Sequence, residues 1–285
     1  MSPRLQDWLY IHHGIRLGLP GYLDILVLSI ALGALLLLRH CRKQELNQGP
    51  AYLLAILSIP LLFLGGKIVY AAQFPQALER GWGFWRGPGS ALYGGLLGLF
   101  VAAVIAFRVY RVSPWPYLDG LALSMALGLF LTRIGCFLAG CNWGAPTDLA
   151  WGVRFPPGSH AFKQHVRMGL IPEDAALSLP VHPTQLYESL AGLLLLLFGF
   201  WMIRRKAPAG RTFFVLTGLY AGFRFVEEFV RADYGASHGW LTFAQWVSLG
   251  MLALLAGACA AARRAGSDSD RSGNSHRLGA ATRKA

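Results

Sequence analysis

The chain has 285 residues, of which 54% are hydrophobic and only 14% are charged, and its mean hydropathy is +0.43. Soluble globular domains carry about 25% charged residues, so this composition excludes an ordinary soluble domain and predicts an integral membrane protein. The net charge of +12 does not by itself indicate a nucleic-acid partner, because basic residues of a membrane protein gather in the loops on one side. We therefore expect no nucleic-acid binding.

Seven apolar segments follow one another along the chain, and each approaches the roughly 20 residues that cross about 30 Å of hydrocarbon. They cover residues 22–38, 51–72, 91–107, 118–138, 186–203, 213–229 and 243–262. The sequence therefore predicts an all-α polytopic membrane protein with seven transmembrane helices. The first 19 residues contain Asp7, His12 and Arg16 and lack a continuous apolar run, so no cleavable signal peptide is expected.

The distribution of Lys and Arg predicts the orientation. With the N-terminus outside, 15 of the 26 basic residues lie on the inner side, 8 lie on the outer side and 3 lie within spans. The positive-inside rule then favours N-out, C-in, and places the region 142–185 outside. We expect one transmembrane domain over residues 1–262 and a disordered, basic cytoplasmic tail over 263–285, which is rich in Ser, Gly and Arg.

Tyr93, Gly94 and Gly95 open the third segment. Adjacent glycines weaken a helix by about 1 kcal/mol each relative to alanine, so they need a reason. Close helix packing is the more common one in membranes, and close approach of a lipid is the alternative.

Arg133 stands at the end of the fourth segment, where the apolar run gives way to small and polar residues. A cation at membrane depth costs several kcal/mol unless it faces a polar cavity or a partner, which indicates a functional site. The alternative is an arginine that reaches from a helix end to the lipid headgroups. Gly135, Gly140 and Gly144 suit irregular backbone that lines a cavity.

Cys136 and Cys141 follow Arg133 with four residues between them. Such a pair can form a disulfide or bind a metal, but no histidine ligand lies nearby in the sequence, so we expect no metal site and favour simple packing.

Polar side chains cluster where the fifth segment begins: His182, Gln185, Tyr187 and Glu188. A helix that begins at Pro183 would place Gln185 and Glu188 three residues apart on one face. His182 is either part of a site or an interfacial cap.

The sixth segment contains Arg224 and Glu228, four residues apart on one helical face, and Glu227 adds a further carboxylate. A self-neutralising ion pair is one reading. However, two arginines with acidic partners also suit the phosphate of a lipid, which guanidinium groups bind through paired donors.

Several motifs in this order resemble those of the bacterial prolipoprotein diacylglyceryl transferases. They are GGKIVY at 65–70, YGGLLG at 93–98, RIGCF at 133–137, WG at 143–144, RFP at 154–156, HPTQLYE at 182–188, FR at 223–224 and EF at 228–229. The resemblance implies a multi-pass protein of the bacterial inner membrane, with its active site towards the outer leaflet. It also implies transfer of the diacylglyceryl group of phosphatidylglycerol to the lipobox cysteine of a prolipoprotein signal peptide, without a cofactor.

By the same resemblance, Arg133 and Arg224 would handle the lipid headgroup, Glu228 would orient Arg224, and Tyr93 or His182 would accept a proton. Substrate contacts are expected at Arg133, Tyr22, Gly94, Gly95, Gln185, Tyr187 and Glu188.

The chain departs from the family pattern at the expected site. Tyr93 stands where the family carries histidine, Cys136 and Cys141 stand where it carries asparagine and glutamate, and Thr132 stands where it carries glycine. Two alternatives follow: a catalytically altered or inactive paralogue that binds lipid or lipoprotein, and a membrane thiol oxidoreductase that uses the two cysteines.

Overall fold

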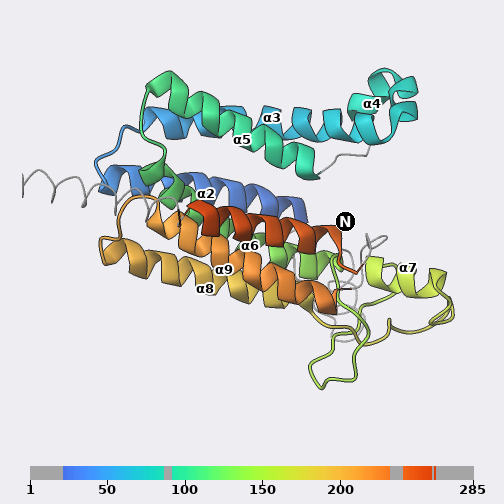
Figure 1. The fold of residues 1–285 in the computed structure, drawn as a ribbon. Helices are drawn as coiled ribbons and strands as arrows, with labels where there is room; N and C mark the ends of the chain where they lie inside the picture. The colour runs from blue at the N-terminus through green and yellow to red at the C-terminus, as the bar shows by residue number, and fades with distance from the viewer. Residues whose placement is uncertain (1–21, 87–91, 232–239, 259, 261–285) are drawn as a thin grey trace, which may run out of the picture. The chain divides into compact units, whose positions relative to one another are not determined.

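The structure is a computed structural model that describes residues 22–86, 92–231, 240–258 and 260 (Figure 1). The described residues are helical and contain isolated β-bridges but no strand. The helices are α2 (Tyr22–Lys43), α3 (Gly49–Gln73), η1 (Pro75–Arg80), α4 (Trp82–Arg86), α5 (Leu92–Tyr110), α6 (Trp115–Ala139), α7 (His160–Arg167), α8 (Thr184–Arg204), α9 (Arg211–Glu227) and η2 (Glu228–Val230). A last helix covers Phe243–Ala258.

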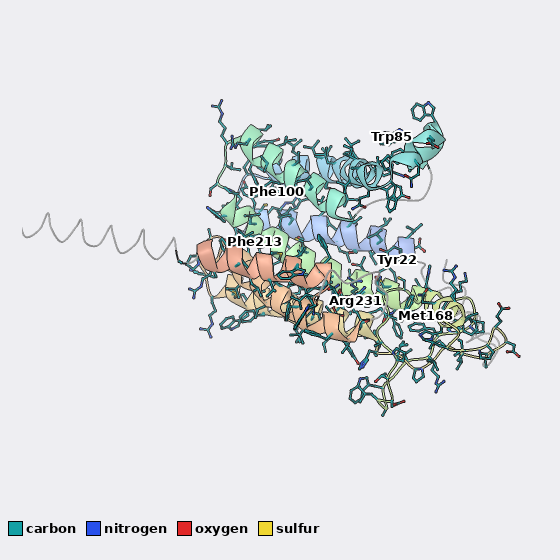
Figure 2. All side chains as sticks on the ribbon, turned by 45° about the vertical axis from the view of Figure 1, so that its right-hand side comes forward. Tyr22, Trp85, Phe100, Met168, Phe213 and Arg231 are labelled. Carbon is teal, nitrogen blue, oxygen red and sulfur yellow. The ribbon has the colours of Figure 1, made fainter. Side chains whose placement is uncertain are left out.

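Four helices, α2, α3, α6 and α8, are long and apolar enough to cross a membrane. Large apolar side chains are exposed along them and along α5, among them Ile56, with 69% of its surface exposed, and Phe100, with 65% (Figure 2). Soluble monomers rarely expose such extensive apolar surface, because water penalises it. The all-α membrane class is thus confirmed, while the count of seven spans and the orientation stay predictions.

The helices overlap all the predicted segments, although α2 extends to Lys43 rather than to residue 38, and the sixth segment ends differently. There the α-helix ends at Glu227, and the 3₁₀ helix η2 replaces the predicted last turn. The Val230 carbonyl accepts a hydrogen bond from the Ala145 amide at 2.8 Å. The chain therefore leaves the helix because its backbone pairs with the loop after α6. The tail predicted over 263–285 lies outside the described residues.

The chain divides into two compact units. Unit 1 comprises Met1–Tyr22, Arg133–Ala191 and Phe214–Ala285, and unit 2 comprises Leu23–Thr132 and Gly192–Phe213. The single domain expected from the sequence stays a prediction.

In unit 2, α3 and α5 lie side by side (Figure 1). A Cβ atom at Gly94 would collide with the Gly65 carbonyl, and one at Gly98 with the Leu61 carbonyl. Small residues let two helix backbones approach this closely. Packing thus accounts for Gly94, as the more common reading of the sequence predicted.

In unit 1, the region between α6 and α8 is more ordered than a plain loop. It contains α7, which the sequence analysis did not predict and whose first turn is capped by Ser159, with the Phe162 amide donating to Oγ at 3.2 Å. An apolar cluster formed by Trp143, Phe155, Ala161 and Val181 supports the region from within.

Candidate active site

A sharp turn ends α6 and shapes the site. The Gly140 amide donates to the Phe137 carbonyl, and the Cys141 amide donates to the Cys136 carbonyl, each at 3.1 Å. This is a Schellman motif, which needs a left-handed residue, and Gly140 supplies it with φ of +67°. The motif brings the side chains on either side of the glycine together, one turn beyond Arg133.

The first turn of α8 is docked onto this turn by two hydrogen bonds. The Thr184 hydroxyl donates to the Asn142 carbonyl, and Gln185 Nε2 donates to the Cys141 carbonyl, each at 2.8 Å. Gln185 and Glu188 are both fully buried on the face that the sequence predicted they would share.

Glu188 joins two arginines. Its Oε2 lies 2.5 Å from Arg133 Nε, and its Oε1 lies 2.9 Å from Arg231 Nη1. Arg133 therefore has a buried anionic partner, which argues against a side chain that merely reaches for headgroups. The sequence analysis expected Glu188 to contact substrate, whereas its two oxygens face the arginines.

Arg224 forms the second half of the arrangement. Its Nη1 pairs with Glu228, as the four-residue spacing predicted, and lies 3.4 Å from Glu227 Oε2. Glu228 also accepts a hydrogen bond from the Thr242 hydroxyl at 2.8 Å. The side chains of both glutamates are almost completely buried, while Arg224 retains 18% exposure.

We call these six residues the arginine–glutamate cluster: Arg133, Arg224, Arg231, Glu188, Glu227 and Glu228. Their formal charges cancel, which is what burial requires, because an unpaired charge in a low-dielectric interior costs several kcal/mol. All six belong to unit 1.

Arg231 was not predicted as a site residue; it is one of the eight basic residues that the sequence places on the outer side. In the structure Arg231, labelled in Figure 2, is 9% exposed. Its guanidinium pairs with Glu188 and approaches Asn142 Oδ1 at 3.3 Å. A signal was present, because Arg224, Glu228 and Arg231 are spaced at i, i+4 and i+7, which is one helical face.

Two tyrosines lie within electrostatic range of the cluster. Tyr22 lies near Arg133 and the two cysteines, and its contact with the substrate stays a prediction. Tyr220, on α9, lies near Arg133, Arg224 and Glu188, and the sequence analysis did not single it out.

Cys136 and Cys141 contact each other through the Schellman motif, and Asn142 Nδ2 lies 3.4 Å and 3.5 Å from their sulfur atoms. Neither cysteine forms a disulfide in the structure. The interaction with Cys136, together with burial, raises the pKa of the Cys141 thiol above its usual range. Cys136 Sγ also lies 3.9 Å from Arg133 Nη1. The described residues hold no group of three or more side chains suited to a metal ion.

His182 and Tyr187 form a separate polar chain. The Tyr187 hydroxyl lies 3.3 Å from His182 Nδ1 and accepts a hydrogen bond from Trp151 Nε1 at 2.8 Å. Gly144 permits the approach of this segment, because a Cβ there would lie 2.6 Å from the Cβ of His182. The side chain of Tyr93 lies outside the described part of the chain, so its predicted role stays a prediction.

Comparison with known proteins decides the family. A family model described as prolipoprotein diacylglyceryl transferase matches residues 16–261. The chain belongs to the prolipoprotein diacylglyceryl transferase family. A member from Clostridium tetani, named phosphatidylglycerol--prolipoprotein diacylglyceryl transferase, is 30% identical over 80% of this chain and 87% of its own. Proteins of the same name from Mannheimia succiniciproducens and Nitratidesulfovibrio vulgaris are each 34% identical over 67% of this chain, and the matches cover 66% and 67% of those proteins.

Proposed function

We propose that this chain transfers the diacylglyceryl group of phosphatidylglycerol to the lipobox cysteine of a prolipoprotein, forming a thioether and releasing glycerol phosphate. The observation that supports the proposal is the arginine–glutamate cluster in a member of this transferase family. A charged but overall neutral cluster in an apolar membrane protein suits a lipid with an anionic headgroup and apolar acyl chains.

The arginines would bind the phosphate. Arg133 engages Glu188 through Nε, and Arg224 engages its glutamates through Nη1. A guanidinium group carries five N–H donors, so each arginine retains donors for phosphate oxygens. Cations held in place by buried carboxylates would stabilise the phosphate as it departs, since they need no rearrangement when its charge grows. Glu188 and Glu228 would orient these arginines.

The remaining predicted contacts extend the proposal to the rest of the lipid. Oε1 of buried Gln185 has no hydrogen-bond partner among the described residues, which suits a hydroxyl of the glycerol headgroup. Tyr22 would contact the headgroup beside Arg133, and Tyr187 would do so together with His182. Gly95 would allow close approach of an acyl chain, and Tyr93 would contribute a hydrogen bond.

The proposed location is the bacterial inner membrane, with the site open to the outer leaflet. Prolipoprotein signal peptides and membrane lipids would meet the site there.

The test is transfer by the purified protein in vesicles that contain phosphatidylglycerol, with a lipobox peptide as acceptor and mass spectrometry as readout. We expect Arg133→Ala and Arg224→Ala to abolish the mass increase of the peptide, and Arg167→Ala, at an exposed position on α7, to retain it. Full transfer by either site variant would refute the proposed site. Absence of transfer by the unaltered protein, with lipid still bound, would instead favour a lipid-binding paralogue.

The cysteine pair favours a second candidate function, a membrane thiol oxidoreductase. Adjacent free thiols are what dithiol–disulfide exchange requires. Disulfide exchange with a model dithiol that disappears in the Cys136→Ser, Cys141→Ser double variant would support it, whereas equal exchange by this variant would remove it.

A further inference from the structure

The proposed transfer needs a base, because the cysteine of the acceptor peptide reacts as a thiolate and its thiol is a poor nucleophile. The two candidates from the sequence suit this task poorly. A tyrosine phenol, such as that of Tyr93, has a reference pKa of about 10 in peptides, and a phenol with that pKa is a weak base at neutral pH. Among the described residues, the hydrogen-bonding partner of the His182 ring is Tyr187, outside the arginine–glutamate cluster.

Glu227 differs from the other two carboxylates of the cluster. Both oxygens of Glu188 pair with arginines. Glu228 pairs with Arg224 and accepts from Thr242. Glu227 has one long contact, 3.4 Å from Arg224, and its Oε1 is buried without a hydrogen-bond partner in the described part of the chain.

This unpaired oxygen is not a surface feature. Only 1% of the Glu227 side chain is exposed, so bulk water does not satisfy the oxygen. A buried polar atom without a partner costs about 1–3 kcal/mol, and one that persists at a site calls for a reason. An oxygen that accepts a proton during the reaction would explain why this atom has no permanent hydrogen-bond partner.

The charges that face Glu227 come from its own helix and from three other segments. Arg224 lies on its own helix, Arg133 lies on α6, Arg231 follows η2, and Glu188 lies on α8. Glu228 and the Tyr220 hydroxyl complete the surroundings. The three arginines and the two other glutamates leave one positive charge, which Glu227 neutralises while it is ionised.

This balance matches the charge changes of the reaction. When the bond between the glyceryl carbon and the phosphate oxygen breaks, the phosphate gains one negative charge. If Glu227 takes up a proton in the same step, the total charge of the cluster and the phosphate stays constant. A low-dielectric site favours such compensation, because uncompensated charge is costly there.

We propose that Glu227 is the general base that removes the proton of the acceptor cysteine, an inference that rests on the proposed transferase function. The sulfur attacks the glyceryl carbon that carries the phosphate, the C–S bond forms, and the C–O bond breaks with its electron pair passing to the phosphate oxygen. Glu227 holds the thiol proton and then delivers it to the released glycerol phosphate. The carboxylate is thereby regenerated for the next cycle.

The experiment compares two acceptor peptides that differ in one atom, a lipobox peptide with cysteine and the same peptide with selenocysteine. A selenol is ionised at neutral pH and needs no base. We expect Glu227→Gln to lower the transfer rate to the cysteine peptide about 100-fold or more, and to leave the rate to the selenocysteine peptide within about threefold of the unaltered protein. The rate of this variant with the cysteine peptide should rise about tenfold per pH unit below the thiol pKa of about 8.5.

Three further variants separate a base from a structural role. Arg133→Ala should lose transfer to both peptides, because phosphate binding does not depend on the acceptor atom. Glu173→Gln, at an exposed position of the loop, should match the unaltered protein. Glu227→Asp keeps a carboxylate, but its shorter side chain places that carboxylate farther from the acceptor thiol. Its preference for the selenocysteine peptide should therefore lie between those of the unaltered protein and Glu227→Gln.

The outcomes distinguish this proposal from the one on which it rests. Equal losses on both peptides for Glu227→Gln, or an unchanged selenol preference for Glu227→Asp, would overturn the base assignment and leave the transferase function standing. Absence of transfer to either peptide by the unaltered protein would overturn the function itself.

Discussion

The arginine–glutamate cluster of unit 1 and the α3–α5 pair of unit 2 hold helices together by opposite means. In the cluster, buried charges cancel one another across segments that lie far apart in the sequence. In the pair, Gly65, Gly94 and Gly98 remove side chains so that two backbones touch. The first arrangement leaves polar donors for a ligand, whereas the second is explained by packing.

Glycine therefore has two structural roles in this chain. Gly140 provides a left-handed turn, and Gly144 clears room for the His182 segment, so both shape the candidate active site. Gly94 serves van der Waals packing, which is the main attraction between helices in lipid. Variants in which activity and stability are measured separately can test whether the cluster serves catalysis and the α3–α5 contact serves stability.

The largest effect is expected at Glu188. Glu188→Gln keeps the shape of the side chain but leaves Arg133 and Arg231 without their shared counter-charge. Breaking a buried ion pair costs about 3–5 kcal/mol, so both the free energy of unfolding and the transfer rate should fall sharply. Thermal unfolding in detergent and the peptide assay measure the two effects, with Glu173→Gln as the control. An unchanged unfolding temperature would show that this pairing does not support the fold.

A smaller effect is expected at the α3–α5 contact. In Gly94→Ala, the added methyl group meets the Gly65 carbonyl, and this overpacking should cost about 1–3 kcal/mol of stability. Gly95→Ala is the matched control, because the nearest atoms to a Cβ there, in the side chain and carbonyl of Leu62, both lie at 3.3 Å, a much looser fit than at Gly94. If Gly94→Ala instead unfolds like Gly95→Ala but loses transfer, Gly94 acts on the lipid and the contrast between the two regions fails.

The smallest effect concerns His165, which is buried in α7 and accepts a hydrogen bond from the Leu179 amide at 3.3 Å. Burial lowers the pKa of His165 below its ordinary value of 6.5. Above a pH of about 6.5, His165 is neutral in both the folded and the unfolded chain. As the pH falls below that value, the unfolded chain binds a proton more readily than the folded chain does. The stability of the folded state therefore decreases, by less than about 1 kcal/mol.

Unfolding temperatures at pH about 7.5 and about 5 measure this dependence. His165→Gln should reduce the difference between the two temperatures, while His160→Gln, at an exposed position of the same helix, should not. An equal reduction in both variants would show that the dependence lies elsewhere.

The all-α membrane class and the positions of the long apolar helices, to within about five residues, could be predicted from the sequence alone, as could the Arg224–Glu228 pair and the buried position of Arg133 beside a polar partner. These followed from local chemistry: the length of apolar runs, and the cost of Arg133 and Arg224 at membrane depth. The Arg224–Glu228 pair could be predicted because a helix fixes the geometry of residues four apart.

Only the tertiary structure decided which charges pair. Arg133 meets Glu188 because a Schellman turn and two hydrogen bonds dock α8 onto the end of α6, and nothing in either segment alone specifies that docking. For the same reason Arg231 looked like a loop charge, although it is buried against a carboxylate 43 positions earlier. Long-range pairing depends on how segments pack against one another. The lack of a hydrogen-bond partner for Glu227 Oε1 among the described residues is therefore evident only from the tertiary structure.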